Sequence, residues 1–481
     1  MIAPADTDAK SLSRTRRGAA FASGPAAAHN RPVMDVTLLS RVQFATTIAF
    51  HYLYPPLSIG LGVVLVVMEG LYLKTRLPIY QQMTRFWVRV FGLTFALGVA
   101  TGIVMEFEFG TNWASYSRFV GDVFGSALAA EGIFAFFLES GFLALLLFGW
   151  DKVGPRWHFF ATSMVCLGAH FSAIWIIVAN SWMQTPAGFR LAAHGLGTRA
   201  EVTDFWAMVF NPSAVERLTH TVLGAWQAGA FLVISVSAYY LLKGKFEDFA
   251  RRSLKVGLAL ALAASIGSLV TGHAGAEGVS RNQPAKLAAM EAHFPASAPA
   301  DLYVFGWVDE TKQRVYGVAV PGMLSWILHG DTRAPVTGLL AFAPEDRPPV
   351  QLVFQAYHLM VAVGMGLIGI ALAGAFYAVR RGAAPPAWLL RLLAVSVLGP
   401  QIANQAGWMT AEVGRQPWIV YGLMRTSEGV SRSVPAGSVV FSLVLFTLIY
   451  TLLFALFLFL LDSKITHGPL PDDLTASPKR A

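Results

Sequence analysis

Residues 437–461 read GSVVFSLVLFTLIYTLLFALFLFLL, an apolar run without a charged side chain. About 20 helical residues cross the roughly 30 Å hydrocarbon core of a bilayer, so this run predicts a membrane-spanning helix. We place nine such segments at about 43–73, 92–110, 126–149, 158–181, 219–242, 253–273, 352–379, 388–411 and 437–461. The sequence therefore predicts an all-α polytopic membrane protein of nine transmembrane helices, with a long outer loop between the sixth and the seventh.

The composition agrees with this fold class. Hydrophobic residues make up 55% of the chain and charged residues 13%, whereas soluble proteins carry about 25% charged residues. We attribute the net charge of +8 to loops on the inner membrane face, not to nucleic-acid binding. A single cysteine, Cys166, excludes intrachain disulfides, c-type haem attachment and an iron–sulfur ligand set. A metal would need His, Met or carboxylate ligands.

Basic residues outnumber acidic ones in four alternate loops, 74–91, 150–157, 243–252 and 380–391. Such loops stay on the cytoplasmic side of a membrane. We therefore expect the N-terminus and the long loop outside and the C-terminus inside.

Five regions follow from this pattern. Residues 1–41 are expected to be a disordered or mis-started extension, with Met1 or Met34 as the true start. The other regions are helices one to six in 42–273, the outer loop in 274–351, helices seven to nine in 352–461 and a cytoplasmic tail in 462–481. The outer loop is too long for a passive connection, which suggests a binding lid.

A carboxylate lies near the end of the eighth segment, in the stretch from Trp408 to Trp418. Glu412 precedes Arg415 by three residues, and Gly414 and Pro417 are expected to end the helix there. An ionisable residue at membrane depth is costly and suggests a functional site. The alternative is a Glu–Arg pair that only stabilises a helix end.

Other residues that could bind metal or carry protons fall in the same outer half of the membrane. They are His51, Glu106, Glu108, Glu131, Glu139, His220 and Met360. Glu131 and Glu139 are eight residues apart and share a helix face, as a proton relay requires, whereas at most one of Glu106 and Glu108 faces the same site. The one-sided distribution favours a common site over scattered core residues.

Histidine and methionine on two different helices suit a six-coordinate electron-transfer haem, so His220 and Met360 form a candidate ligand pair. His358 is a rival ligand, but it faces differently on its helix. His51 lies about a third of the way into its helix, where a proline pair can kink the helix and make room for a ring. We interpret His170 as a hydrogen-bonded core residue.

Several separate motifs carry a resemblance to a known family. They are SRVQF at 40–44, FALGVATG at 95–102, MEFEFGTNW at 105–113, the span from Glu131 to Ser140, ANSWMQ at 179–184, KLAAME at 286–291 and GRQPW at 414–418. With these motifs, the chain from Met34 to about residue 461 resembles subunit I of the cytochrome bd quinol oxidases. Its short outer loop resembles the cyanide-insensitive type.

The resemblance implies three haems: two are b-type, and the third is d-type or b-type. His220 and Met360 would ligate the low-spin haem, and His51, Glu131 and Glu412 the high-spin pair, in an order that family members vary. The residues Trp408 and Arg415 would flank the haems, Lys286 and Glu291 would serve quinol oxidation, and Glu139, Ser140, Ser172 and Glu106 would lie on the proton path. The departures are His358, where some members carry an arginine, and His273, where some carry an acid.

The implied activity is that of a terminal oxidase in the bacterial inner membrane, with a second membrane subunit. It would oxidise ubiquinol or menaquinol, reduce dioxygen to water and generate a proton gradient without pumping, with Glu131, Glu139 and Arg415 as catalytic residues. One alternative is a b-type cytochrome that relays electrons without oxygen reduction. Another is a transporter with a midplane ion site. A visible spectrum would distinguish the three.

Overall fold

The computed structural model describes residues 35–195, 197–380 and 385–469. The chain divides into two units, Met1–Asp35 and Val36–Ala481, and the description below concerns the second. Most of the expected N-terminal extension and the tail from residue 470 lie outside the described residues.

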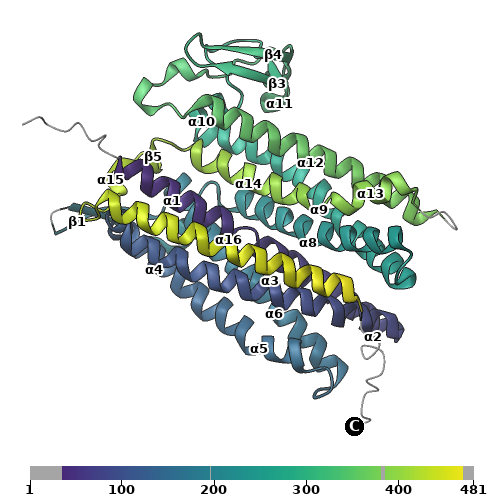
Figure 1. Ribbon diagram of the computed structural model, residues 1–481. Helices are drawn as coiled ribbons and strands as arrows, with labels where there is room; N and C mark the ends of the chain where they lie inside the picture. Colours follow the sequence, from purple (N-terminus) through teal and green to yellow (C-terminus); the bar gives the residue numbers. More distant parts are fainter. Residues whose placement is uncertain (1–34, 196, 381–384, 470–481) are drawn as a thin grey trace, which may run out of the picture. The chain divides into compact units, whose positions relative to one another are not determined.

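Within the described residues, nine helical segments are long and apolar enough to cross a membrane. Their bounds are Val36–Thr75, Pro78–Thr111, Ala114–Phe148, Pro155–Gln184, Ala214–Lys243, Glu247–Asn282, Pro344–Val379, Ala387–Val413 and Ala436–His467. They lie side by side as a helical bundle (Figure 1). The predicted fold class is confirmed.

Several helices extend beyond the apolar segments that the sequence predicts. Helix α3 (Pro78–Thr111) begins within the predicted loop 74–91, and α4 (Ala114–Glu131) begins within the predicted loop 111–125. Likewise, α1 starts at Val36, α9 (Glu247–Asn282) runs past residue 273, and α16 (Ala436–His467) runs past residue 461. Apolar windows detect only the part of a helix that lies in hydrocarbon, whereas capping and backbone hydrogen bonds decide where it ends.

Two of the nine segments are interrupted by proline. The first consists of α1 (Val36–His51) and α2 (Pro55–Thr75). His51 therefore ends a helix, whereas the sequence predicted it about a third of the way into one. Pro55 and Pro56 start α2, because proline lacks the N–H that would continue α1. The eighth consists of α13 (Ala387–Val395) and α14 (Leu398–Val413), where Pro400 cannot donate to the carbonyl of residue 396.

A π-helical turn, η1 (Gly132–Phe136), joins α4 to α5 (Phe137–Phe148). Single π-turns inside α-helices are uncommon and are often found at functional sites. Here the turn immediately follows Glu131 and precedes Glu139.

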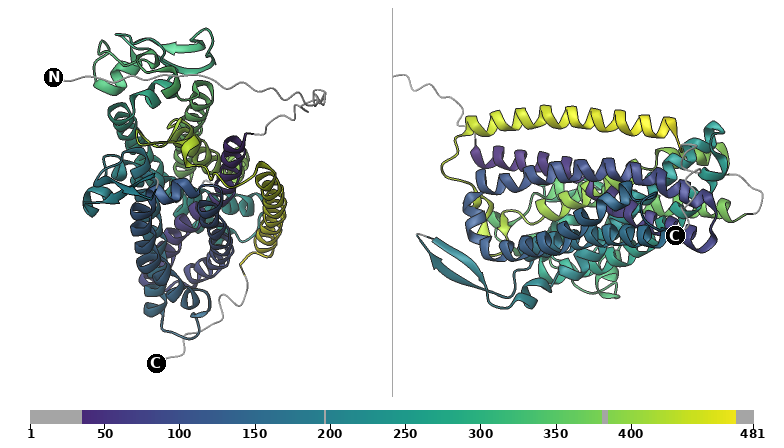
Figure 2. Two further views of the ribbon diagram at one scale, coloured as in Figure 1. Left: turned by 90° about the vertical axis from the view of Figure 1, so that its left-hand side faces the viewer. Right: turned by 90° about the horizontal axis from the view of Figure 1, so that it is seen from below.

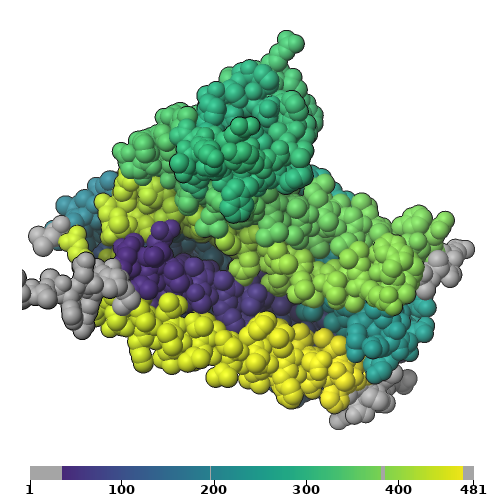
Figure 3. All heavy atoms as spheres, turned by 45° about the horizontal axis from the view of Figure 1, so that its top comes forward, coloured from purple at the N-terminus to yellow at the C-terminus, as the bar shows by residue number. Residues whose placement is uncertain are grey.

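The bundle is packed most closely around α8 (Ala214–Lys243). A Cβ atom at Gly60 of α2 would lie 2.3 Å from the carbonyl oxygen of Ala225 on α8, so only glycine allows this crossing. Helix α16 lies at the edge of the bundle beside α1 (Figure 2). On the other side of α1, Gln405 of α14 donates to the carbonyl of Ala49 at 2.7 Å. Figure 3 shows α1 in purple, between α16 in yellow and the green part of the chain.

The segment between α9 and α12 (Val350–Val379) folds into ordered elements. They are α10 (Pro284–Met290), the antiparallel strands β3 (Leu302–Asp309) and β4 (Arg314–Val320), α11 (Met323–His329) and the 3-10 turns Leu339–Ala341 and Pro344–Asp346. Figure 1 shows the hairpin beyond α10 and α12. The ring of His358 on α12 reaches the carbonyl of Tyr303 at 2.7 Å and ties this hairpin to the bundle.

Smaller elements complete the connections. They are the antiparallel hairpin of β1 (Phe189–His194) and β2 (Gly197–Val202), the short helix α7 (Phe205–Val209), the strands β5 (Trp418–Val420) and β6 (Met424–Arg425), and α15 (Thr426–Gly429). The hairpin β1–β2 follows α6 (Pro155–Gln184), and β5 follows α14. The ends of α6 and α14 are where the candidate site begins.

Candidate functional site

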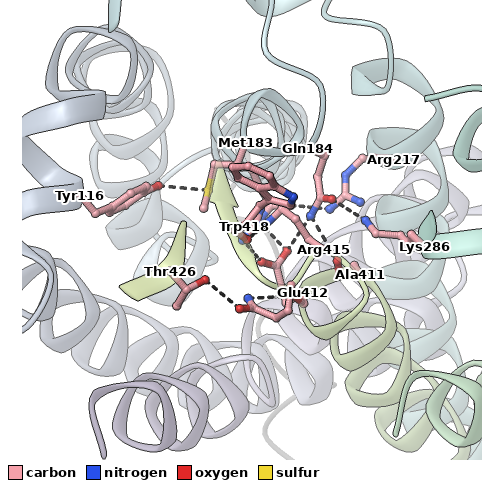
Figure 4. Close-up of polar contacts among 12 residues, drawn as sticks. Tyr116, Met183, Gln184, Arg217, Lys286, Ala411, Glu412, Arg415, Trp418 and Thr426 are labelled. Atoms are coloured by element: carbon pink, nitrogen blue, oxygen red, sulfur yellow. Dashed lines mark hydrogen bonds and ion pairs between the residues drawn. The ribbon is translucent and has the colours of Figure 1, made fainter. Parts of the chain in front are cut away.

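Glu412 in the last turn of α14 is held by three side chains. Arg415 Nη2 donates to Glu412 Oε2 at 2.5 Å, and Asn180 Nδ2 and Gln184 Nε2 donate to Oε1 at 3.1 and 3.3 Å (Figure 4). The first partner comes from the turn after α14, and the other two come from the end of α6. The interpretation as an isolated Glu–Arg pair is therefore wrong, because the carboxylate joins two helices.

Cations outnumber carboxylates in this cluster. Arg217 of α8 donates to Asn180 Oδ1, and Lys286 Nζ of α10 donates to Gln184 Oε1 at 2.5 Å. Among the described residues, Glu412 is the one carboxylate bonded within the cluster. Arg415 Nη1 and Arg217 Nε are buried without a partner in the described chain. Because a buried cation is costly unless it is paired, the cluster is suited to bind carboxylate groups of a ligand.

Lys286 shows the electrostatic consequence of this arrangement. Its side chain is buried on a helix that lies outside the membrane-spanning segments. Burial, followed by the nearby guanidinium groups of Arg217 and Arg415, lowers the pKa of Lys286 well below its usual value, and Glu412 opposes the shift. An added anion in the cluster would favour the charged lysine.

The two predicted histidine ligands share one arrangement. His51 Nδ1 lies 2.9 Å from Thr101 Oγ1, and His220 Nδ1 lies 3.0 Å from Thr271 Oγ1. Each threonine hydroxyl donates to a backbone carbonyl of its own helix, so its oxygen accepts the Nδ1–H of the ring. This fixes the tautomer and leaves Nε2 with a bare lone pair, which is the form that ligates iron.

On α12, Met360 is a better candidate metal ligand than His358. The two ring nitrogens of His358 lie 2.9 and 2.7 Å from the carbonyl oxygens of Phe354 and Tyr303, so neither is free to bind a metal. Met360 Sδ lies against Gly407 of α14, where a Cβ atom would come within 2.9 Å of the sulfur. A thioether is a possible axial ligand of haem iron.

Other predictions at single residues have separate outcomes. His170 contacts the carbonyl of Cys166 at 2.7 Å and accepts from Trp226 Nε1 at 2.9 Å, which confirms it as a hydrogen-bonded core residue. Trp408 packs edge-on against Tyr52 with ring centroids 5.4 Å apart. Because Tyr52 follows His51, this contact brings the end of α1 beside the helix that carries Glu412.

The predicted proton-path residues are only partly brought together. Ser172 of α6 donates to Glu131 Oε1 at 2.5 Å, and Glu139 is buried against Gly168 of the same helix. Both carboxylates therefore face α6, on either side of the π-turn. Glu106 and Ser140 are exposed on the surface of the chain. Ser140 has no hydrogen bond among the described side chains.

Lys286 and Glu291, the predicted quinol residues, point to different partners. Glu291 is buried next to Tyr357 of α12. Burial raises the pKa of Glu291 to about 8, although Tyr357 opposes the shift. Glu291 Oε2 has no partner in the described chain. The structure thus places the lysine in the Glu412 cluster and the glutamate outside it, beside Tyr357.

Comparisons with known proteins identify the family of this chain. The family model described as cytochrome bd terminal oxidase subunit I matches residues 39–469. The chain belongs to this family. It is 39% identical to cytochrome bd ubiquinol oxidase subunit 1 of Bacillus subtilis, over 92% of this chain and 96% of that one. It is 35% identical to cytochrome bd-II ubiquinol oxidase subunit 1 of Escherichia coli, over 90% and 97%.

A solved structure of the family has the same fold. The bd oxidase from Geobacillus thermodenitrificans is 30% identical, with a TM-score of 0.83 over 91% of this chain and 100% of that one. The relay and transporter alternatives are not favoured, because these relatives are oxidases.

Sequence reasoning missed several members of this bd-family site. Asn180 and Gln184 lie in the quoted motif 179–184, but no role was expected of them. Arg217 lies three residues before His220, ahead of an apolar segment, which was a usable signal. Their contacts join α6, α8 and α14, so only the packing of these helices reveals them.

The pocket of about 580 Å³ beside α1 is not this site. Its lining includes Arg41, Glu310, Arg347 and Arg425, and none of the predicted haem or quinol residues. It lies between the start of α1, the outer loop and the turn after α14. The candidate site around Glu412 is therefore distinct from this pocket.

Proposed function

We propose that this chain is the haem-binding catalytic subunit of a membrane terminal oxidase that oxidises quinol and reduces dioxygen to water. The observation that carries the proposal is the cluster around Glu412, in which three basic side chains, Arg217, Lys286 and Arg415, surround one carboxylate in a chain of the bd family. Relatives named ubiquinol oxidases support quinol as the substrate. Bound haem would supply the iron for electron transfer and for oxygen binding.

The donor groups fit haem in two ways. His51 and His220 each present Nε2, and Met360 presents a thioether, while Glu131 and Glu412 present carboxylates. The unpartnered N–H groups of Arg415 and Arg217 match the carboxylates that haem carries on its rim. We assign His220 and Met360 to a low-spin b-type haem, and His51, Glu131 and Glu412 to a high-spin pair of one b-type and one d-type or b-type haem.

Two groups of residues would accept or transfer protons, one in the outer loop and one along α6. Glu291 is the proposed acceptor of a quinol proton, and Lys286 orients the loop against the Glu412 cluster. Glu139 and the Glu131–Ser172 pair would pass protons along α6 toward the oxygen site, with Glu106 nearby. With the outer loop outside and protons drawn from the cytoplasm, charge separates without a pump.

The chain would work with a second membrane subunit. Large apolar side chains are exposed on the bundle, among them Phe134, Phe137, Phe376 and Phe441. Lipid or a membrane partner must cover such surfaces. Copurification of a second subunit from native membranes tests this part of the proposal.

The deciding experiment is a visible spectrum of the purified, dithionite-reduced complex, together with oxygen uptake. We expect b-haem bands, a chlorin band in the red if the third haem is d-type, and oxygen consumption that requires added quinol. A haem-free protein, or one that oxidises no quinol, would contradict the proposal. Spectra of b haems alone with quinol-dependent oxygen uptake would assign the third haem as b-type.

A further inference from the structure

Gln184 uses every polar atom of its side chain at the centre of the cluster. It is 1% exposed, its Oε1 accepts from Lys286 Nζ, and its Nε2 donates to Glu412 Oε1 and to the carbonyl of Ala411, both at 3.3 Å (Figure 4). Its backbone carbonyl accepts from Gln283 Nε2 at 3.0 Å. One residue therefore joins the end of α6, the start of α10 and the last turn of α14.

The chemistry of the amide suits this position. Its oxygen faces an ammonium group and its nitrogen faces a carboxylate, so it satisfies both without adding a charge. A carboxylate in its place would repel Glu412, and an ammonium group would repel Lys286. In a buried site such polarised hydrogen bonds strengthen one another.

The two partners depend on Gln184 unequally. Glu412 keeps Arg415 and Asn180 when Gln184 is lost. Lys286 Nζ has no other hydrogen-bond acceptor among the described residues, and its stem packs on Gly414, where a Cβ atom would lie 2.9 Å from Lys286 Cγ. Removing the amide therefore breaks the connection and leaves the carboxylate held.

We infer that Gln184 is a positioning residue that couples Lys286 of the outer loop to the Glu412 carboxylate, so that changes at the loop alter the surroundings of the haem that Glu412 binds. The inference rests on the proposed function, which makes Glu412 a haem ligand. It assigns to Gln184 a role in communication between the loop and the oxygen site, and not a role in the chemistry.

A double-mutant cycle on the intact complex tests this coupling. The four proteins are the unmodified one, Lys286→Met, Gln184→Leu and the double variant, and the readouts are the electron paramagnetic resonance and absorption signals of the oxidised high-spin haems. We expect Lys286→Met to shift these signals on its own and to cause no further shift in the Gln184→Leu background. Additive shifts would overturn the inference, because Lys286 would then act without Gln184.

A second variant and a control keep the test decisive. Gln184→Glu retains the acceptor for Lys286 but opposes Glu412, so it should shift the signals with Lys286 intact; an unshifted spectrum would overturn the inference. If Gln184→Leu does not assemble, the cycle is run with Gln184→Ala, which also removes the acceptor for Lys286. Gln82→Leu replaces a buried glutamine near the start of α3 and should leave the signals unchanged.

Failure of the proposed function would look different. Glu412→Ala with an unchanged high-spin spectrum would remove Glu412 as a ligand and so contradict the site assignment. Additive effects in a complex whose spectrum does respond to Glu412→Ala would contradict only the role of Gln184.

Discussion

A threonine hydroxyl decides which nitrogen each candidate histidine offers to a metal. Thr101 and Thr271 occupy Nδ1 of His51 and His220, respectively, and each threonine is itself fixed by its own helix backbone. His358 and His170 lack a free nitrogen, which separates them from the two candidate ligands. The hydrogen-bond partners of the ring nitrogens, more than the depth of burial, distinguish the candidate ligands from the other two histidines.

Thr271→Val should weaken haem binding at His220. Loss of a hydrogen-bond partner behind a metal-bound histidine typically costs about 10–100-fold in metal affinity. The low-spin haem signal should therefore fall during dilution or haem competition, whereas His220→Ala should abolish it. Thr219→Val is the matched control, because Thr219 is exposed and bonds only to its own helix. A retained low-spin signal in His220→Ala would refute the ligand assignment.

Glu291 should give quinol oxidation a rising pH dependence. Its pKa of about 8 keeps the carboxyl mostly protonated at neutral pH, so the base form that accepts a quinol proton reaches half of its maximum at about pH 8. We expect kcat/KM for quinol to rise with pH and level off above 8, and Glu291→Gln to lose this rise together with most of the activity. Haem content should stay normal in that variant; early haem loss would make the residue structural.

The same shift affects the stability of the loop in a defined direction. The folded state holds its proton at Glu291 more tightly than the unfolded chain does, so stability falls as pH rises from about 4.5 to about 8. Glu291→Gln should flatten this part of the stability profile, measured by thermal unfolding at several pH values. An unchanged slope would show that another group causes it.

At the scale of elements, a buried polar group pins α2 to α6. His158 Nδ1 lies 2.7 Å from Glu69 Oε1, Thr162 donates to Glu69 Oε2 at 2.6 Å, and the Glu69 and His158 side chains are each 1% exposed. The ring of Trp150 stacks on His158 with centroids 3.8 Å apart. These contacts lie at the opposite end of α6 from Gln184, about 39 Å away along the helix, so each end of α6 is fixed by its own polar cluster.

Glu69→Leu should destabilise the protein strongly. Removing one partner of a buried hydrogen-bonded pair typically costs about 1–3 kcal/mol, because the other is left without its partner. The thermal midpoint of the purified complex should fall, and a Glu69→Leu, His158→Phe double variant should recover part of the loss. Glu247→Gln is the control, since its pair with Arg251 is exposed and contributes little. A midpoint equal to that of the control would contradict the pinning role.

At the scale of the whole molecule, orientation in the membrane remains a prediction from charge. Lys312 lies in the β3–β4 turn and Asp151 between α5 and α6, and both side chains are 69% exposed. Lys312→Cys should react with an impermeant maleimide in intact spheroplasts, and Asp151→Cys only after permeabilisation. Cys166, the single native cysteine, faces the bundle and provides the background control. Reversed labelling would invert the topology.

The sequence alone determined the fold class and supplied the candidate ligands, because a bilayer imposes length and polarity on every spanning segment. Continuous apolar runs predicted nine spans, and the rarity of membrane-embedded ionisable residues identified His51, His220, Glu131 and Glu412. Helix ends were misplaced where prolines or projecting polar turns set them, since hydropathy does not report backbone hydrogen bonds.

The tertiary structure decided which candidates share a site and which nitrogen each histidine offers. Contacts between residues hundreds of positions apart, such as Asn180 with Glu412, depend on how helices pack, and helix packing has no local signature in sequence. The Glu–Arg pair at the end of α14 shows what the sequence determined and what the tertiary structure decided. Sequence placed it at membrane depth, and only the packing of α6, α8 and α10 around it produced a cluster with more cations than carboxylates.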